Sequence, residues 1–202
     1  MVNLSGFKLS KKVILALVVV ALVGEGIWAY QTLSKKSAVS GGQTPVPSTT
    51  SSTKPKTTLL LQSSQNTIKI GDKLTVAVNI AADKATDGVD IIILYDPKLL
   101  TVVPVEGTKN AMMVGSIYSD YPINAVDGVK GKITVSGITT QVGGVVPRGT
   151  FGSITFTAKA AGQAKISLDF TKGSTVDSNV IETKTAKDLL EEIRNTEVNI
   201  TP

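Results

Sequence analysis

Three aspartates are the residues of this chain whose type and spacing could do chemistry. Asp83, Asp87 and Asp90 lie close together in the sequence, and two carboxylates about 5 Å or about 6.5–9.5 Å apart in a cleft can hydrolyse a glycosidic bond. Asp83 and Asp87 could also bind calcium at a strand end, but they lack the dense D-x-D-x-D spacing of a calcium loop. Solvated turns explain them better. We therefore predict no catalytic residue and no metal site.

The composition excludes most other kinds of catalytic site. The 202 residues include no cysteine and no histidine. Disulfides and thiolate metal sites are therefore impossible, and the usual general base and commonest metal ligand are missing. We expect a protein that is not an enzyme and that needs no cofactor.

The formal net charge of +5 is concentrated near the N-terminus. Five lysines flank an apolar run there: Lys8, Lys11, Lys12, Lys35 and Lys36. Without them and Glu25, the chain holds 16 basic and 15 acidic residues. The basic character thus belongs to the membrane end, and nothing indicates nucleic-acid binding.

The apolar run predicts membrane insertion. Val13–Gly24 is uncharged, and after Glu25 and Gly26 the apolar character resumes to Tyr30. A cleaved signal peptide needs small residues at the spacing of a cleavage site, and this run fits that need poorly, because bulky Trp28 separates the two best candidate residues. As a signal anchor, about 18 residues approach the minimum bilayer span, with Trp28 and Tyr30 at the interface. We favour a cytoplasmic basic N-terminus at 1–12 and a transmembrane anchor at 13–33.

A polar spacer follows the apolar run. Residues 34–58 are rich in Ser, Thr and Pro and almost free of large apolar side chains, so we expect a disordered linker. With either reading of the N-terminus, residues 59–202 are exported. The expected location is the cell surface, as an extracellular domain anchored in the membrane.

Apolar residues at every second position dominate the sequence after the spacer. Lys73–Ala81 alternates strictly, and Gly88–Tyr95 is apolar on both faces after Asp90, as in a central strand. The remaining predicted strands are Thr101–Val105, Lys132–Thr139, Thr150–Ala160, Ala164–Phe170 and Glu197–Thr201. Eight or nine strands with turn residues between them predict a β-sandwich or jelly roll.

One short helix is predicted near the C-terminus, over Ala186–Arg194. Thr185 is a suitable N-cap and Asp188 supplies an acid three residues later. Leu189, Leu190 and Ile193 would form its apolar stripe.

Four motifs in order carry a resemblance to a known family. They are GVDIIILYDPKLL at 88–100, GKITVSG at 131–137, GTFGSITFTAKAAG at 149–162 and DSNV at 177–180. Together they resemble the cohesin domain over essentially all of residues 59–202. The resemblance implies an all-β, nine-stranded jelly-roll β-sandwich. To this fold the residues add one short helix near the C-terminus, and the transmembrane helix and the linker precede it.

The resemblance also implies a partner. Cohesins generally bind dockerins, which are small calcium-loaded helical modules, through a flat sheet face, and need no metal themselves. Aligning on Tyr95-Asp96-Pro97 puts Asp90 where many members present an aspartate on that face. Strand alternation directs Asp90, Ile92 and Leu94 outward, although a helix or loop could cover the two apolar residues. The predicted partner-binding residues are Asp90, Ile92, Leu94, Thr134, Ser136 and Ile138.

Two other functions remain open from the sequence. Carbohydrate binding needs a row of exposed aromatic rings, but Trp28 lies in the apolar run, and Tyr118 and Tyr121 in the loop Ser116–Pro122 are better explained as packing residues. A structural or adhesive surface protein is the other alternative. A cellulosome scaffold carries several cohesins, whereas this chain carries one, so we expect a single module on the cell surface. We expect this module to bind a dockerin-like protein or a polysaccharide and to be linked to polysaccharide-degrading assemblies.

Overall fold

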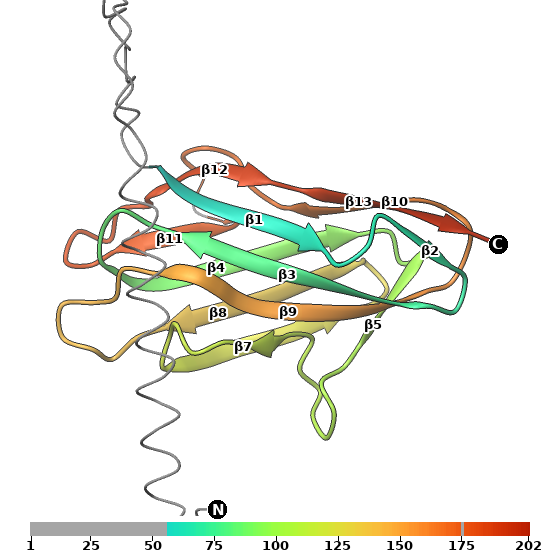
Figure 1. Cartoon of the computed structure of the whole chain (residues 1–202). Coiled ribbons are helices and arrows are strands. Elements are labelled where there is room, and N and C mark those ends of the chain that lie inside the picture. Colours follow the sequence, from blue (N-terminus) through green and yellow to red (C-terminus); the bar gives the residue numbers. More distant parts are fainter. Residues whose placement is uncertain (1–55, 175) are drawn as a thin grey trace, which may run out of the picture. The chain divides into compact units, whose positions relative to one another are not determined.

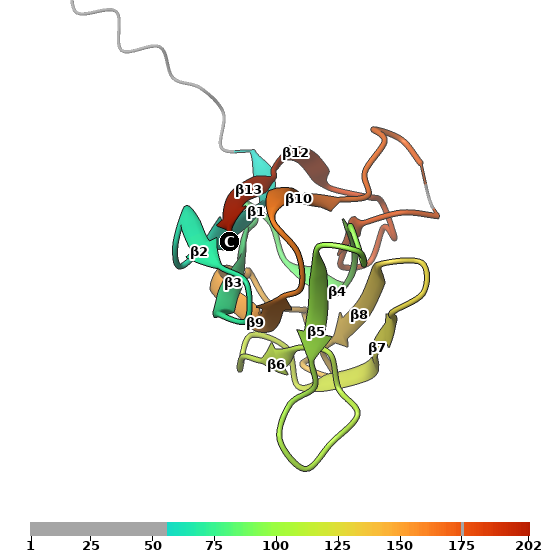
Figure 2. The ribbon, with the colours of Figure 1, turned by 90° about the vertical axis from the view of Figure 1, so that its right-hand side faces the viewer.

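The structure, a computed structural model, describes residues 56–174 and 176–202, and these form two β-sheets packed face to face with no helix among them (Figures 1 and 2). The six-stranded sheet has the order β12 (Leu190–Arg194), β1 (Thr57–Ser63), β3 (Lys73–Ala81), β9 (Arg148–Ala158) and β5 (Leu100–Val103), with β6 (Met113–Val114) also on β9. The seven-stranded sheet has the order β2 (Thr67–Lys69), β13 (Thr196–Thr201), β10 (Gly162–Leu168), β4 (Thr86–Tyr95), β8 (Lys132–Ile138) and β7 (Asp120–Asp127), with β11 (Asn179–Glu182) also on β4.

Alternating apolar residues build the core between the sheets, as the sequence predicts. On β3, Leu74, Val76 and Val78 are fully buried, and its bounds match the predicted strand. In the facing sheet, Ile91 and Ile93 of β4 are also fully buried. Since side chains alternate between faces along a strand, the intervening residues point away from the core. The two-sheet all-β sandwich is therefore confirmed.

The hydrophobic core is formed entirely by residues of the folded part of the chain. Its buried apolar residues all lie between Leu59 and Ile200, and residues Ser52–Pro202 form one compact unit. Phe156 of β9 meets Tyr95 of β4 edge to face, with ring centroids 5.3 Å apart, and so joins the two sheets. Residues 52–202 therefore contain everything the sandwich needs to fold.

The helix predicted over Ala186–Arg194 is wrong. Lys184 and Ala186 have φ angles of 71° and 54°, which a right-handed helix excludes. Strand β12 occupies the end of this segment and pairs in parallel with β1. A helix this short is marginal unless tertiary contacts support it, whereas the edge of β1 offers hydrogen bonds to a strand. Thr185 donates its hydroxyl to Glu182, at 2.7 Å, instead of capping a helix.

A strand occupies part of the region that the sequence analysis assigned to a loop. The predicted loop Ser116–Pro122 overlaps β7, which pairs with β8 along the edge of the seven-stranded sheet. Pro122 lacks a backbone N–H, and proline within a strand is confined to edges and bulges. The register of β7 indeed shifts between Asp120 and Ile123.

The predicted basic N-terminus, membrane anchor and nearly all of the linker (1–12, 13–33 and 34–55) lie outside the described residues. The described part of the chain holds no helix with the length and apolarity that crossing a bilayer requires. Strand β1 begins at Thr57, which is 1% exposed and therefore part of the fold. The folded domain thus starts two residues before the predicted boundary at Leu59.

Candidate functional site

The six residues predicted to bind a partner lie on one face of the seven-stranded sheet. Strands β4 and β8 are antiparallel neighbours, with Asp90 opposite Ser136 and Ile92 opposite Thr134. Residues directly opposite each other in an antiparallel pair point to the same side of the sheet. Ile138 and Leu94 follow by alternation on this side, which faces away from the core. We call this surface the β4–β8 face, and β4, β8 and β7 lie side by side in it (Figure 1).

The six residues differ in accessibility. Leu94 and Ile138 are 38% and 40% exposed, which is high for large apolar side chains. Ile92 and Ser136 are only 8% and 6% exposed. Along a strand, Leu94 and the position opposite Ile138 are six residues apart, or about 20 Å. The accessible apolar groups therefore lie towards the two ends of the face.

The expectation that Ile92 is accessible is wrong, because the neighbouring segment is held against it. The backbone carbonyl of Ile92 accepts a hydrogen bond from the backbone N–H of Asp169, at 2.8 Å. The backbone N–H of Ile92 donates to the hydroxyl of Ser178, at 2.9 Å. The segment between β10 and β11 therefore runs beside Ile92, as in the alternative that a loop covers it. At 8% exposure, the side chain of Ile92 offers little surface to a partner.

Asp90 has a fixed orientation at the centre of the face. Its Oδ1 atom accepts a short hydrogen bond from the Ser136 hydroxyl on the adjacent strand. The carboxylate is half-buried, and its second oxygen accepts no hydrogen bond from the described residues. A carboxylate held in this way can accept a hydrogen bond from a partner without losing further side-chain entropy.

Ile123 on β7 is an apolar contributor that the sequence analysis missed. It lies opposite Ser136 in the β7–β8 ladder and is 46% exposed. Ile123 and Ile138 are therefore diagonal neighbours and form one apolar patch. The alternation of Ile123, Ala125 and Asp127 on one side with Asn124 and Val126 on the other could have revealed the strand, but Pro122 obscured it.

The three aspartates considered for catalysis or calcium binding have separate structural roles. Asp83 accepts a hydrogen bond from the Thr57 hydroxyl, at 3.3 Å, and Asp87 accepts one from the Thr183 hydroxyl, at 2.7 Å. Asp90 is bonded to Ser136. Among the described residues, no group of three or more Asp, Glu, His or Cys side chains is arranged to hold a metal ion.

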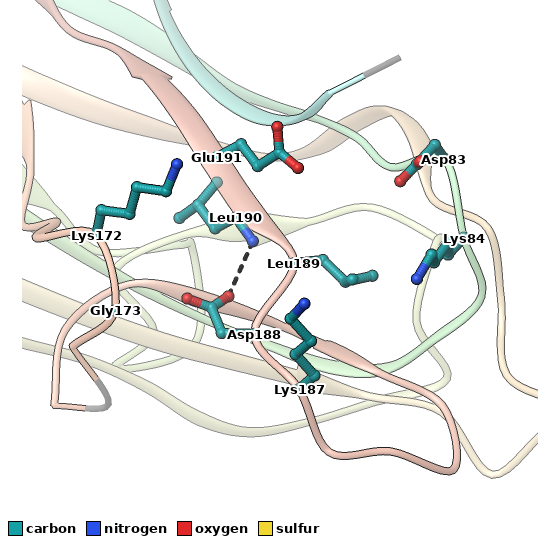
Figure 3. A pocket seen from close by; sticks show the side chains of 9 residues that line it. All are labelled: Asp83, Lys84, Lys172, Gly173, Lys187, Asp188, Leu189, Leu190 and Glu191. Carbon is teal, nitrogen blue, oxygen red and sulfur yellow. Dashed lines mark hydrogen bonds between the residues drawn. The ribbon is translucent and has the colours of Figure 1, made fainter. Parts of the chain in front are cut away.

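A surface cavity of about 370 Å³ lies near the start of β1 (Figure 3). Leu189 and Leu190 form its apolar part, and charged side chains surround them. Asp188 accepts hydrogen bonds from the backbone N–H groups of Val180 and Leu190, at 3.0 and 2.9 Å, and so fixes the turn into β12. Its carboxylate is thus committed to holding the backbone.

The lysine on one side of this cavity is also engaged. Lys84 forms an ion pair with Glu182, at 2.6 Å. This contact raises the pKa of Lys84 and, together with the Thr185 hydroxyl, lowers the pKa of Glu182. Lys84 is therefore a charged lysine and not a neutral base. Lys84 and Asp188 of this cavity thus both have structural roles.

The two tyrosines considered for sugar binding are packing residues. Tyr118 is 3% exposed, and its ring meets Phe151 edge to face with centroids 6.0 Å apart. Tyr121 packs against the same Phe151 ring at 5.4 Å. The hydroxyl groups of Tyr118 and Thr86 are hydrogen-bonded at 2.8 Å. Rings packed edge to face against the core present no flat strip on which sugars could stack.

Removing the Tyr118 hydroxyl should flatten the alkaline part of the stability profile. Burial raises the pKa of Tyr118 to about 12, partly opposed by the hydrogen bond with Thr86. The folded state therefore favours the protonated phenol, and this contribution is complete below pH about 10 and lost between pH about 10 and 12. Tyr118→Phe should lose about 1 kcal/mol at pH 7 but fall less steeply than wild type above pH about 10. Thermal unfolding of both proteins across this pH range checks the prediction. Identical slopes of stability against pH for wild type and Tyr118→Phe would contradict the raised pKa of Tyr118.

The family model for the cohesin domain matches residues 57–199, which covers the sandwich except for the last two residues of β13. The chain belongs to the cohesin family. Cohesin domains are non-enzymatic protein–protein interaction modules. A search of curated proteins found no match.

Solved cohesin structures share the fold of this chain at low sequence identity. A type II cohesin from the cellulosome of Acetivibrio cellulolyticus is 19% identical, with a TM-score of 0.59, and the match covers 72% of this chain and 96% of that one. A cohesin from a type II cohesin–X–dockerin complex of the same organism is 14% identical, with a TM-score of 0.60, over 72% and 100%. A type I cohesin in complex with a dockerin, from Clostridium thermocellum, is 16% identical, with a TM-score of 0.55, over 73% and 100%.

Proposed function

We propose that this cohesin is a cell-surface receptor for a calcium-loaded dockerin, which it binds through the β4–β8 face. The observation that carries the proposal is the composition of this face. Exposed Leu94, Ile123 and Ile138 share one face of the sheet with the oriented carboxylate of Asp90, whose position along the strands lies between those of Leu94 and Ile138. Apolar anchors beside one fixed polar group are typical of the centre of a protein interface.

The solved relatives support the choice of partner. Two of them were crystallised in complexes that contain a dockerin. A flat sheet without a sugar-stacking strip fits a helical protein surface better than a polysaccharide chain. Leu94, Ile123, Thr134 and Ile138 are the proposed contacts, Asp90 is the proposed polar contact, and Ile92 and Ser136 support them from beneath.

The N-terminal region supports surface attachment in this proposal. Val13–Tyr30 is apolar with basic flanks, and residues 34–55 supply a polar spacer. Such a spacer of about 20 residues has a mean reach of about 25 Å, which would let the domain meet a partner away from the lipid surface. A single cohesin anchored in this way would hold one dockerin-bearing protein at the cell.

Capture of host proteins, followed by binding to purified dockerins, tests the proposed function. Residues 52–202 are immobilised and exposed to proteins of the host, in calcium and in a chelator, and the captured proteins are identified by mass spectrometry. We expect a calcium-dependent catch with paired calcium-loop repeats, and a Kd below about 1 μM for the purified module, equivalent to about 8 kcal/mol of binding free energy. Removing calcium should weaken binding at least 100-fold, because the dockerin needs calcium to fold.

Two outcomes would contradict the proposal. The first is that no protein with paired calcium loops is retained, or that purified dockerins do not bind in calcium. The second is retention of the domain on an insoluble polysaccharide with no dockerin bound, which would move the module to the carbohydrate-binding class.

A further inference from the structure

The segment between β10 and β11 contains a buried carboxylate that lacks a positive partner among the described residues. Asp177 is 5% exposed, and one of its oxygens, Oδ2, accepts a hydrogen bond from the backbone N–H of Thr171. The other oxygen, Oδ1, is buried and has no hydrogen-bond partner. None of the ion pairs between described residues involves Asp177. An ionised carboxylate removed from water without a counter-charge is costly.

A second buried oxygen in the same segment also lacks a partner. Asn179 is 6% exposed, and its side-chain Nδ2 donates to the backbone carbonyl of Asp177, at 3.2 Å. This hydrogen bond fixes the orientation of the amide, so its Oδ1 is the atom left over, and that oxygen is buried and unpaired. Two unsatisfied acceptors two residues apart indicate a missing group that is positively charged or donates hydrogen bonds.

The strand register brings a third oxygen-bearing side chain to this place. Asn179 of β11 lies directly opposite Asp90 of β4, and opposite residues in an antiparallel pair have Cα atoms about 4.5–5.5 Å apart and share a side of the sheet. Asp177 lies two residues before Asn179, in the bend that leads into β11. The two unpaired oxygens therefore lie where the chain enters the strand that pairs with Asp90, and the two carboxylates carry a formal charge of −2.

We propose that Asp177 and Asn179, together with the carboxylate of Asp90, bind a divalent cation of the calcium type. Carboxylate and amide oxygens are the ligands that calcium prefers, and its flexible geometry tolerates an irregular set completed by backbone carbonyls or water. The bound ion would neutralise Asp177 and tie Asp177 and Asn179 to β4. Because Asn179 lies opposite Asp90 and Ser178 is hydrogen-bonded to Ile92, the ion would stabilise one border of the β4–β8 face.

Calcium binding to the domain alone tests this proposal, and no dockerin is needed, so its result is independent of the proposed function. Residues 52–202, freed of metal by a chelator, are titrated with calcium chloride by calorimetry. Thermal unfolding is measured in calcium, in magnesium, and in sodium chloride of equal ionic strength. We expect one site per molecule and a rise in Tm of about 4 °C or more at calcium 100-fold above Kd. Magnesium should have a smaller effect, because it demands a stricter octahedral geometry.

Substitutions locate the site. Asp177→Asn should abolish calcium binding or weaken it at least 100-fold, whereas Asn179→Asp keeps an oxygen ligand and should bind at least as tightly as wild type. Asp127→Asn, an exposed acid on β7 of the same sheet, is the matched control and should bind like wild type. If Asp177→Asn does not fold, calcium binding by wild type and by Asn179→Asp, both measured by calorimetry, still tests the proposal.

The proposal is overturned by either of two results. One is that wild type binds no calcium and has the same Tm in calcium as in sodium chloride of equal ionic strength, in which case the unpaired oxygens contact buried water only. The other is binding that a folded Asp177→Asn variant leaves unchanged, which would place the ion elsewhere.

Discussion

Phe151→Ala should lower the free energy of unfolding by about 4 kcal/mol, the middle of the range for removing a buried aromatic ring. Phe151 is fully buried, and its ring carries the edge-to-face contacts of Tyr118 and Tyr121. A Cβ atom added at Gly137 would lie 2.9 Å from the same ring, which shows how closely the sheets pack there. The variant therefore loses dispersion contacts on several sides and leaves a cavity that a close-packed core fills poorly.

Urea unfolding of residues 52–202 measures this loss. A domain of this size has a total stability of about 5–15 kcal/mol, so the variant should be marginal at 37 °C. Val142→Ala is the matched control, since Val142 is fully exposed at a loop tip and should change stability by less than about 0.5 kcal/mol. A loss below about 1.5 kcal/mol for Phe151→Ala would contradict the packing described for this end of the sandwich.

The double variant Ile123→Glu with Ile138→Glu should weaken dockerin binding at least 100-fold, a loss of about 2.7 kcal/mol. Ile123 and Ile138 are 46% and 40% exposed and neighbour each other diagonally across β7 and β8. In the free domain the new carboxylates can reach water, although the acid at position 138 lies opposite Asp120 and costs some stability, which urea unfolding measures separately. In the complex they would be desolvated without a counter-charge, which interfaces tolerate poorly.

Met113→Glu provides the matched control for that variant. Met113 is 62% exposed on β6, in the other sheet, so the same kind of charge is introduced away from the β4–β8 face. Calorimetry with a purified dockerin should give wild-type affinity for this control. If the double variant and Met113→Glu lost the same amount of affinity, or if the double variant lost none, the β4–β8 face would not be the dockerin-binding surface.

The sequence predicted the sandwich well where apolar alternation was strong. The observed bounds of β3 match the prediction, and β4, β8, β9 and β10 differ from it by about two residues at either end. These strands bury one or both faces, so their hydrophobic pattern and their structure have the same cause. Alternation also predicted which side chains of β4 and of β8 point away from the core, and the observed pairing of these strands brings Asp90 and Ser136 together on one face.

The failures lie where non-local contacts decide the structure. Leu189, Leu190 and Ile193 have helical spacing, but the free edge of β1 and the positive φ angles of Lys184 and Ala186 select a strand. Ile92 points outward as alternation requires, yet hydrogen bonds from Asp169 and Ser178 hold a distant segment beside it. No local pattern reports a partner strand or a covering segment that lies far away in the sequence.

Hydrogen exchange of residues 52–202, with and without a calcium-loaded dockerin, tests the central claim most directly. We expect the complex to slow the exchange of amides in β4, β8 and β7, while amides of β3 and β9 in the other sheet exchange as in the free domain. This pattern would assign the partner to the β4–β8 face. Protection confined to β3, β9 and β6, with no change in β4, β8 or β7, would contradict the account.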